Sequence, residues 1–264
     1  MRITYRYTEN KEYWERRWSN IEVDQPMSNY KVYPLKYAEM CILDKNGPIL
    51  EAGCGTGRIL MYYHNKNYDI IGIDFIKDAI NKIKRSYPEV KAEYGDIKKL
   101  QFKNNTFKYV LAFGLYHNLE NGIKEAINET RRVLMPGGRI CASFRADNIQ
   151  TRLVDWLDNR KARKVNKAKT KVFHKINYSQ KEFLSLMKSN GFHVLDIFAV
   201  ENMPLLYKFS FFRSKNHKKM NENIAREQGY KLSTFGYILQ KFIMKIFPNQ
   251  FCNLYVIIAQ KKDY

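Results

Sequence analysis

The sequence has few cysteines and no long apolar segment. Its four cysteines, Cys41, Cys54, Cys141 and Cys252, are far apart and form no C-x-x-C pair. This spacing is unlike a disulfide framework or a zinc site, so we expect a reduced, cytoplasmic compartment and no bound metal. Lys, Asn or Gln interrupts every apolar run before it reaches the length of a membrane-spanning helix. The first residues, MRITYRYTENKEYWERRW, also lack the apolar core of a signal peptide, so we expect no export.

Acidic residues are scarce as well. The chain has 46 Lys and Arg against 26 Asp and Glu, a formal charge of +20. Most of the excess lies in residues 146–264, which carry 22 basic and 9 acidic side chains; the run Asn159–Lys175 has eight basic residues and no acid. Such runs attract nucleic acid, phosphorylated metabolites or an acidic membrane surface, or they form only a solvated basic face. The sequence leaves these possibilities open.

The pattern of apolar residues predicts an α/β fold. With 45% apolar residues, 19 Tyr and 16 Phe, the chain can bury a sizeable core. In residues 48–145 we expect strands at 49–52, 68–73, 90–94, 109–113 and 139–144, and helices at 58–65, 76–86 and 122–134. Short strands that alternate with helices indicate a parallel sheet with helices on both faces.

The segments outside this core are less regular. We expect residues 1–47 to form a cap of one or two helices, and residues 146–178 and 201–232 to be irregular insertions on the substrate side. Further helices are expected at 179–189 and 235–247, and further strands at 192–200 and 251–260. No repeat or low-complexity linker divides the chain, so we predict one domain over residues 1–264.

Three glycines at alternate positions follow the first core strand. Gly53, Gly55 and Gly57 permit positive φ and close approach of a ligand to the backbone. A dinucleotide-binding turn needs a third glycine at the position where this chain has Arg58. The loop also lacks the lysine of a triphosphate-binding loop. This pattern argues against a nicotinamide oxidoreductase and against a nucleotide triphosphatase.

Two acids follow the next two strands. Asp74 ends the second core strand, where a carboxylate can accept hydrogen bonds from both hydroxyls of a ribose. Asp96 follows the third strand and can accept from an exocyclic amine such as that of adenine, beside the backbone N–H of Ile97. Alone, each acid could simply cap a helix or a turn. In this order they describe a pocket for an adenosine ligand without phosphate.

These motifs resemble those of the class I S-adenosylmethionine-dependent methyltransferases. ILEAGCGTGRIL (Ile49–Leu60) resembles the first motif of that family. The later motifs are matched in order by IIGIDF (Ile70–Phe75), YGDI (Tyr94–Ile97), YVLAFGLYHNLEN (Tyr109–Asn121) and RRVLMPGGRI (Arg131–Ile140). The resemblance covers residues 45–145 strongly and KSNGFHVLDI (Lys188–Ile197) weakly. It implies a Rossmann-like sheet of seven strands, mostly parallel with an antiparallel last strand, and S-adenosylmethionine as cofactor.

The resemblance also implies a set of cofactor-binding residues. They are Glu51, Gly53, Gly55, Gly57, Asp74, Phe75, Asp96, Ile97 and Phe113. Glu51 and the glycine backbone would hold the methionine portion, and Asp74 the ribose. Phe75 would lie against the adenine, Asp96 and Ile97 would bind its edge, and Phe113 would border the cofactor.

The cofactor would supply an activated methyl group, while the protein aligns the acceptor and excludes water. A general base is needed only for a weakly acidic acceptor. His117, just after the fourth core strand, is the candidate base, or it merely packs beneath the substrate loop. Tyr116 beside it is expected to shape the pocket, whereas His174 is a weaker candidate that we expect at the surface or in the core.

An aromatic segment near the N-terminus adds further substrate-side candidates. Tyr13, Trp14 and Trp18 resemble the helix that caps the cofactor in several small-molecule methyltransferases. Trp14 and Trp18 share a helix face, so they could equally pack this helix onto the body of the protein.

The acceptor is less well defined. Enzymes that methylate base amines have an Asn/Asp-Pro-Pro-Tyr/Phe motif where this chain has Phe113-Gly114-Leu115-Tyr116. We therefore expect methylation on oxygen or nitrogen of a small-molecule or glycan/lipid-linked acceptor, either anionic or hydrophobic, with peripheral membrane contact left open. The alternatives are an RNA methyltransferase that uses the basic C-terminal half, and a non-catalytic subunit that binds the cofactor.

Overall fold

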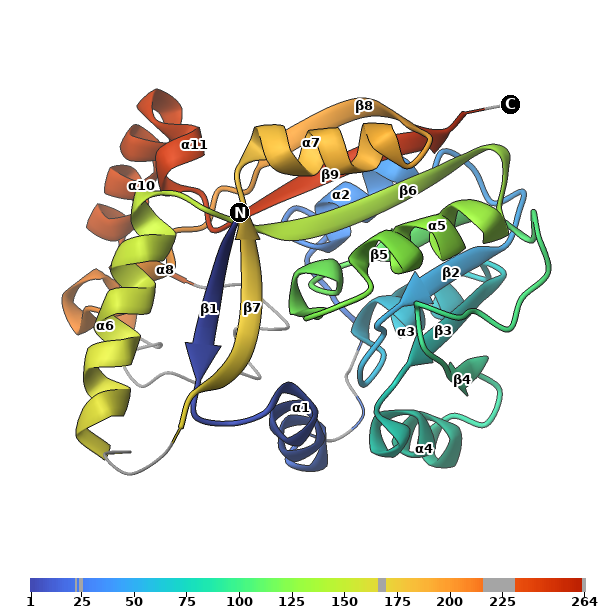
Figure 1. Cartoon of the computed structure of the whole chain (residues 1–264), viewed down its shortest axis with the longest axis horizontal. Coiled ribbons are helices and arrows are strands. Elements are labelled where there is room, and N and C mark those ends of the chain that lie inside the picture. Colours follow the sequence, from blue (N-terminus) through green and yellow to red (C-terminus); the bar gives the residue numbers. More distant parts are fainter. Residues whose placement is uncertain (22, 24–25, 166–169, 216–230, 263–264) are drawn as a thin grey trace.

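One mixed sheet organises the chain (Figure 1). The computed structural model describes residues 1–21, 23, 26–165, 170–215 and 231–262. The strands of the described residues are β1 (Arg2–Arg6), β2 (Ile49–Ala52), β3 (Ile70–Asp74), β4 (Ala92–Tyr94), β5 (Phe107–Ala112), β6 (Leu134–Ala146), β7 (Val172–Tyr178), β8 (Phe192–Ala199) and β9 (Leu254–Lys261). Their order is β1-β7-β6-β5-β2-β3-β4, with β9 on β6 and β8 on β9.

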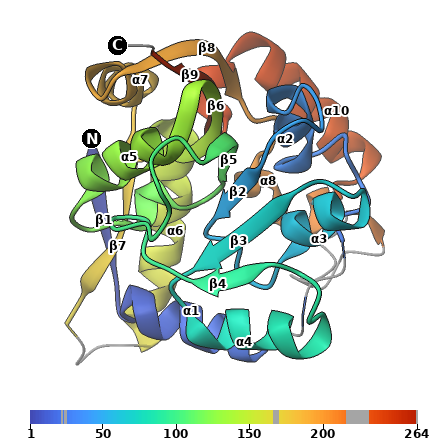
Figure 2. The same cartoon turned by 90° about the vertical axis from the view of Figure 1, so that its right-hand side faces the viewer.

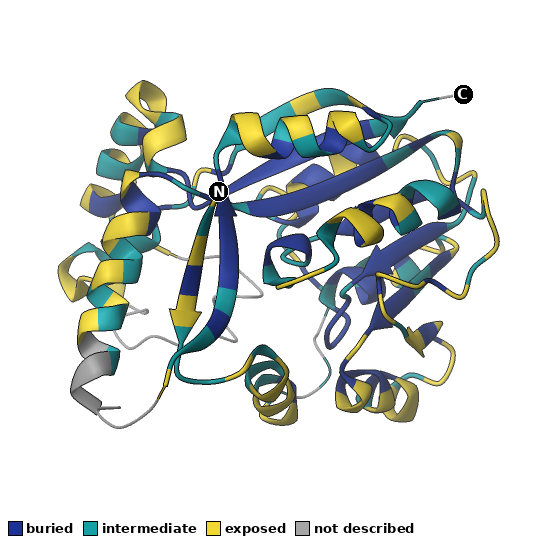
Figure 3. Cartoon of the chain, in the orientation of Figure 1, coloured by how far each residue is buried: buried dark blue, intermediate teal, exposed yellow. Residues whose placement is uncertain are grey.

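Helices cover both faces of this sheet (Figures 1 and 2). They are α1 (Asn10–Ser19), α2 (Leu35–Cys41), α3 (Arg58–Asn65), α4 (Lys77–Ser86), α5 (Ile123–Val133), α6 (Ile149–Val165), α7 (Gln180–Ser189), α8 (Pro204–Tyr207), α10 (Thr234–Ile246) and α11 (Pro248–Phe251), with 3-10 turns η1 (Tyr116–Asn118) and η2 (Ser210–Phe212). Successive residues of β5 enter opposite apolar clusters, Val110 on one face and Leu111 on the other. The central strands are therefore buried on both sides, as parallel strands between helices must be (Figure 3).

The parallel register brings the ends of five strands to one edge. β2 pairs in parallel with both β3 and β5, β3 pairs in parallel with β4, and β5 with β6. The carboxyl ends of these strands therefore lie side by side, and the loops that follow them meet there. Ligands of open α/β sheets bind at this edge.

The expected fold is confirmed, and the sheet is larger than expected. Among the described residues it has nine strands rather than seven, because β1 and β7 extend it from segments expected to be a helical cap and an irregular insertion. Their partner is the end of β6, a strand of 13 residues. Its middle pairs antiparallel with β9, and its last residues pair with β7, with Arg145 opposite Asn177.

The first expected insertion, residues 146–178, is more regular than its sequence suggests. Residues 149–165 form α6, and residues 172–178 form β7. In the sequence VFHKINY of β7, Phe173 and Lys175 are two residues apart and therefore lie on the same face of the strand. The basic residues before this segment obscure the alternation in the sequence. The remainders of the insertions, residues 166–169 and 216–230, lie outside the described part of the chain.

In the part of the chain that the structure describes, no helix has the length and apolarity needed to cross a membrane. The same residues contain no group of three or more His, Cys, Asp or Glu that could hold a metal ion. All four cysteines are free and buried.

Candidate functional site

The glycine loop connects β2 to α3 at the edge where the strand ends meet. Gly53, Gly55 and Gly57 have φ values of 77°, 56° and 95°, in the left-handed region that side chains other than glycine rarely adopt. The N–H of Gly53 donates to the carbonyl of Ile73 at 2.8 Å, which ties the loop to β3. The loop is therefore a fixed turn whose backbone is accessible to a close neighbour.

Asp74 joins this loop to the end of β3. Its Oδ2 accepts from the N–H of Gly55 at 2.9 Å, and its Oδ1 accepts from the N–H of Ile76 at 2.9 Å. Burial raises the pKa of Asp74, whereas the backbone N–H groups that it accepts from lower it. Glu51 is also buried, at the end of β2. Two carboxylates thus lie at adjacent strand ends next to the loop.

The residues expected around the adenine lie at the next strand end. The N–H of Gly95 donates to the carbonyl of Asp74 at 3.1 Å, so the end of β4 lies beside the end of β3. The Asp96 side chain is about half exposed, and its Oδ1 accepts from the N–H of Lys98 at 2.9 Å. Phe75 is exposed, whereas the Ile97 side chain is buried in the core, which leaves only the Ile97 backbone for a ligand.

Helix α1 covers the glycine loop. A Cβ placed on Gly55 would come within 2.7 Å of the Trp18 ring, so the indole contacts this backbone directly. Trp14 stacks on Trp18 with ring centroids 5.5 Å apart. Lys82 of α4 donates to the carbonyl of Trp18 at 2.6 Å and fastens the helix in place. The Trp18 ring therefore lies directly against the backbone of the glycine loop.

His117 lies in η1, immediately beyond β5, and is buried. Burial lowers the pKa of His117 well below its usual value, and the charges of Arg145 and Lys175 and the nearby His174 lower it further. The imidazole hydrogen-bonds to the backbone of Ser143, while its Nδ1 is buried with no hydrogen-bond partner. This histidine is therefore neutral near pH 7 and has one nitrogen free to accept a hydrogen bond.

The neighbours of His117 divide between the cavity and the core. The Tyr116 hydroxyl hydrogen-bonds to Thr130 Oγ1 at 2.7 Å in the core beside α5, so the prediction that Tyr116 shapes the pocket is wrong. The 3-10 turn directs these two successive side chains apart. Phe113 packs edge-on against Tyr33, with ring centroids 5.8 Å apart.

A cavity of about 640 Å³ extends from this point toward α10. Its lining residues include Tyr13, Trp14, Gly114, His117, Arg6, Arg58, Arg145, His174 and Lys175. Tyr13 and Trp14 border this cavity, and their role on the substrate side stays a prediction. His174 lines the cavity instead of lying at the surface or in the core. The sequence reasoning missed Arg145 and Lys175. Arg145 could have been recognised as a site residue because a charged residue directly follows the apolar strand expected at 139–144.

Comparisons with known proteins agree with this geometry. The methyltransferase domain family matches residues 49–138. A demethylmenaquinone methyltransferase of Staphylococcus aureus is 30% identical over 145 residues, which are 50% of this chain and 59% of that protein. The matches to curated relatives span between 37% and 59% of the relatives' own lengths.

Solved structures share the fold over most of the chain. A SAM-dependent methyltransferase of Methanosarcina mazei has a TM-score of 0.58 at 17% identity, covering 88% of this chain and 99% of that one. The [4+2]-cyclase SpnF has a TM-score of 0.55 at 16% identity, covering 97% and 98%. The fold alone therefore does not specify the reaction. The matched domain, the sheet and the glycine loop together identify a class I methyltransferase domain in this chain, which implies S-adenosylmethionine as its cofactor.

Proposed function

We propose that the protein transfers a methyl group from S-adenosylmethionine to an oxygen or nitrogen of a small-molecule or glycan/lipid-linked acceptor. The observation that carries this proposal is the bond from the Gly55 N–H to Asp74 Oδ2, beside a cavity that begins at Gly114 and His117. The loop and its acid suit the cofactor, and the cavity is large enough for an acceptor. When bound, S-adenosylmethionine supplies a methyl group activated by its sulfonium.

The residues of this chain have separate tasks in this proposal. Glu51 and the glycine loop bind the methionine portion, and Asp74 binds the ribose while it keeps its contact with the loop. Asp96, the Ile97 backbone, Phe75 and Phe113 surround the adenine and the cofactor edge. Trp14 and Trp18 on α1 exclude water from the transfer.

His117 is proposed as the residue that takes the hydrogen bond, and then the proton, of the acceptor. Its free Nδ1 supports this role, and its neutral state leaves that nitrogen available. The depressed pKa makes it a weak base, and a base is needed at all only where the acceptor is weakly acidic. Replacement by glutamine (H117Q) is expected to lower kcat about 10²- to 10⁴-fold and to leave cofactor affinity unchanged.

Cofactor binding and methyl transfer are tested separately. Calorimetry with S-adenosylhomocysteine is expected to show binding to the wild type and weakened binding to D74N. The matched control is D78N, an exposed acid in the first turn of α4. Incubation with methyl-labelled cofactor and fractionated extract is then expected to label a small-molecule or lipid fraction. Absence of binding by the wild type would contradict the proposal.

The same extract separates the alternatives. Label in RNA would favour an RNA methyltransferase, and binding without any transfer would favour a non-catalytic subunit. The name of the Staphylococcus aureus relative suggests a further acceptor to include, a demethylated menaquinol. Supplying that quinol directly tests whether the shared segment extends to a shared substrate.

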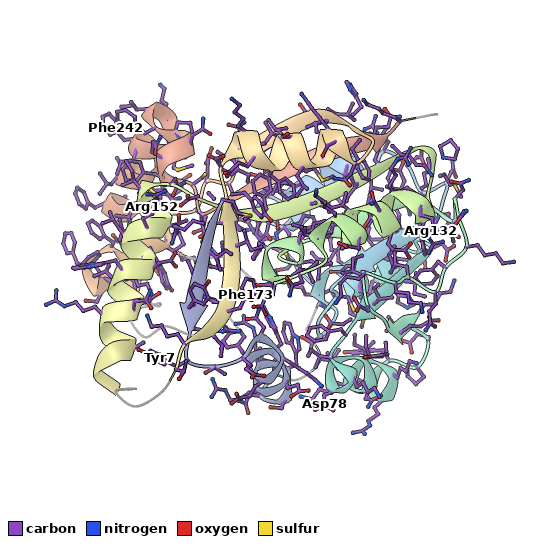
Figure 4. The ribbon with its side chains drawn as sticks, viewed as in Figure 1. Tyr7, Asp78, Arg132, Arg152, Phe173 and Phe242 are labelled. Atoms are coloured by element: carbon purple, nitrogen blue, oxygen red, sulfur yellow. The ribbon has the colours of Figure 1, made fainter. Side chains whose placement is uncertain are left out.

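The outer face of α10 supports a peripheral membrane contact. Its exposed apolar side chains are Phe235, Ile238, Phe242 and Ile246. Lys241 and Lys245 are exposed on the same helix, and Phe242 points outward at its edge of the molecule (Figure 4). Apolar side chains interleaved with lysines suit the headgroup region of an anionic bilayer.

Vesicle sedimentation tests this contact. Binding is expected to phosphatidylglycerol vesicles and not to phosphatidylcholine vesicles, and F242S is expected to weaken it. The control is L43S, an equally exposed apolar residue just beyond α2. Equal sedimentation of both variants, or none by the wild type, would remove the membrane from the proposed partners.

A further inference from the structure

The cavity beside the glycine loop has an unusual charge. Seven of its lining residues are Lys or Arg, and Glu201 is the one acid among the described residues that line it. A sulfonium cofactor would bring a further positive charge to the same space. An acceptor without negative charge would leave this excess uncompensated in a partly enclosed site, where charge interactions are stronger than in water.

Two of these cations lie at the inner wall, on neighbouring strands. Arg145 is the last residue but one of β6 and lies opposite Asn177 of β7, and Lys175 lies two residues before Asn177. Because side chains alternate along a strand, Lys175 and Asn177 share a face of the sheet. Arg145 and Lys175 each lower the pKa of His117 and Arg145 lowers that of Lys175, so the three groups lie within electrostatic range of one another.

The partners of these two cations neutralise them only in part. Lys175 is buried and donates to Asp155 Oδ1 at 3.1 Å, but Asp155 also accepts from Arg2 at 2.9 Å. Arg145 hydrogen-bonds to the amide oxygen of Asn253, which is uncharged. Its Nε is buried with no hydrogen-bond partner. A buried guanidinium N–H without an acceptor is costly, and an oxyanion would satisfy it.

Their position relative to His117 connects them with the reaction. His117 borders the same cavity, and its Nδ1 is buried with no hydrogen-bond partner. A group bound between Arg145 and Lys175 would therefore anchor a molecule whose other end reaches the transferring methyl. A guanidinium can bind a carboxylate or a phosphate through two parallel hydrogen bonds, and a lysine adds a point charge.

We propose that the acceptor carries a carboxylate or phosphate group, and that Arg145 and Lys175 bind this group at the inner wall of the cavity. The inference rests on the proposed function and specifies its substrate class. The anionic group is the anchor of the acceptor, while the atom that is methylated lies nearer His117. An anchor of this kind also compensates the charge of the sulfonium.

Anion binding can be measured without knowing the acceptor. Inorganic phosphate and succinate serve as probes, titrated into the full chain by calorimetry in a chloride-free buffer. We expect both R145Q and K175M to weaken the better probe at least about tenfold. The matched control is K188M, an exposed lysine on α7 outside the cavity, which is expected to bind as the wild type does.

One further variant, R145K, and a titration with the cofactor product guard against misfolding and separate charge from geometry. R145K keeps the charge and removes the forked pair of donors, so it is expected to lose part of the affinity at an unchanged thermal midpoint. S-adenosylhomocysteine is expected to bind all four variants with the affinity of the wild type. If R145Q and K175M lose affinity for the cofactor as well as for the anion, the fold was disturbed in both. The test then depends on R145K, which is expected to bind the anion more weakly than the wild type while it binds the cofactor normally.

The outcomes distinguish the two proposals. If neither probe binds the wild type more tightly than R145Q and K175M, the anionic anchor is refuted while cofactor binding can still hold. If the labelled methyl product from extract passes through an anion exchanger unretained at pH 8, the substrate class is refuted in the same way. Failure of S-adenosylhomocysteine to bind the wild type would refute the proposed function instead.

Discussion

Lys175 offers a quantitative test of the charge in the cavity. Burial lowers the pKa of Lys175 from 10.5 to about 8, Arg145 lowers it as well, and the bond to Asp155 opposes both. The perturbation is K175M, because methionine matches the length of lysine without its charge. Asp155 keeps its bond from Arg2 in this variant, so one partner of the carboxylate remains.

The sign of the effect follows from the two pKa values. Below about pH 8 the lysine is protonated in both the folded and unfolded states, so it adds nothing to the change of the unfolding free energy with pH. Between about pH 8 and pH 10.5 the folded state releases a proton that the unfolded state keeps, so the free energy of unfolding rises with pH. Each pH unit in this window is worth about 1.4 kcal/mol, which gives a total of about 3 kcal/mol.

The assay is urea unfolding of wild type, K175M and K188M between pH 7 and pH 10.5. Other groups titrate in this range, so the informative quantity is the difference between wild type and variant at each pH. We expect that difference to rise by about 3 kcal/mol for K175M and to stay constant for K188M. A flat difference for K175M would refute the argument that this lysine is held charged in a desolvated site.

Three further predictions concern the cofactor loop. Gly55→Ala adds a methyl group at positive φ against the Trp18 ring, and chemical unfolding is expected to show a loss of about 1–3 kcal/mol. The control for this variant is Gly114→Ala, because Gly114 also has positive φ but a Cβ there would meet nothing within 4 Å, so only the backbone strain is expected. S-adenosylhomocysteine is expected to change the tryptophan fluorescence of wild type and of W156F, and to change that of W18F much less, because Trp18 contacts the loop and Trp156 lies exposed on α6. Asp74→Asn is expected to lower the free energy of unfolding by about 1–3 kcal/mol as well as cofactor affinity, since an amide cannot accept from both backbone N–H groups.

The core of the fold was predictable because its signals are local. Glycines at alternate positions predicted the tight loop, and the expected helix at 58–65 coincides with α3. The strand at 49–52 was predicted with the bounds of β2, because apolar runs between turn residues identify parallel strands. The two extra strands were missed for the opposite reason. β1 and β7 pair with each other and with the end of β6, which are contacts between segments distant in the sequence.

The site likewise has features that the sequence predicts and features that it does not. The positions of Glu51, Asp74 and Asp96 after successive strands follow from their order in the sequence, because parallel strands end at one edge. The direction of a side chain does not follow from order. Tyr116 and His117 are neighbours in the sequence, yet one enters the core and the other borders the cavity.

The sequence by itself determined the family, the cofactor loop and the parallel core, since each depends on residues close together in the chain. The tertiary structure alone decided that Trp18 contacts Gly55, and that Arg145, Lys175 and His174 converge on one cavity. Those residues come from α1, the end of β6 and β7, and no local pattern in the chain indicates that these elements meet. A net charge of +20 describes the whole chain, but only folding concentrates part of it where an acceptor would bind.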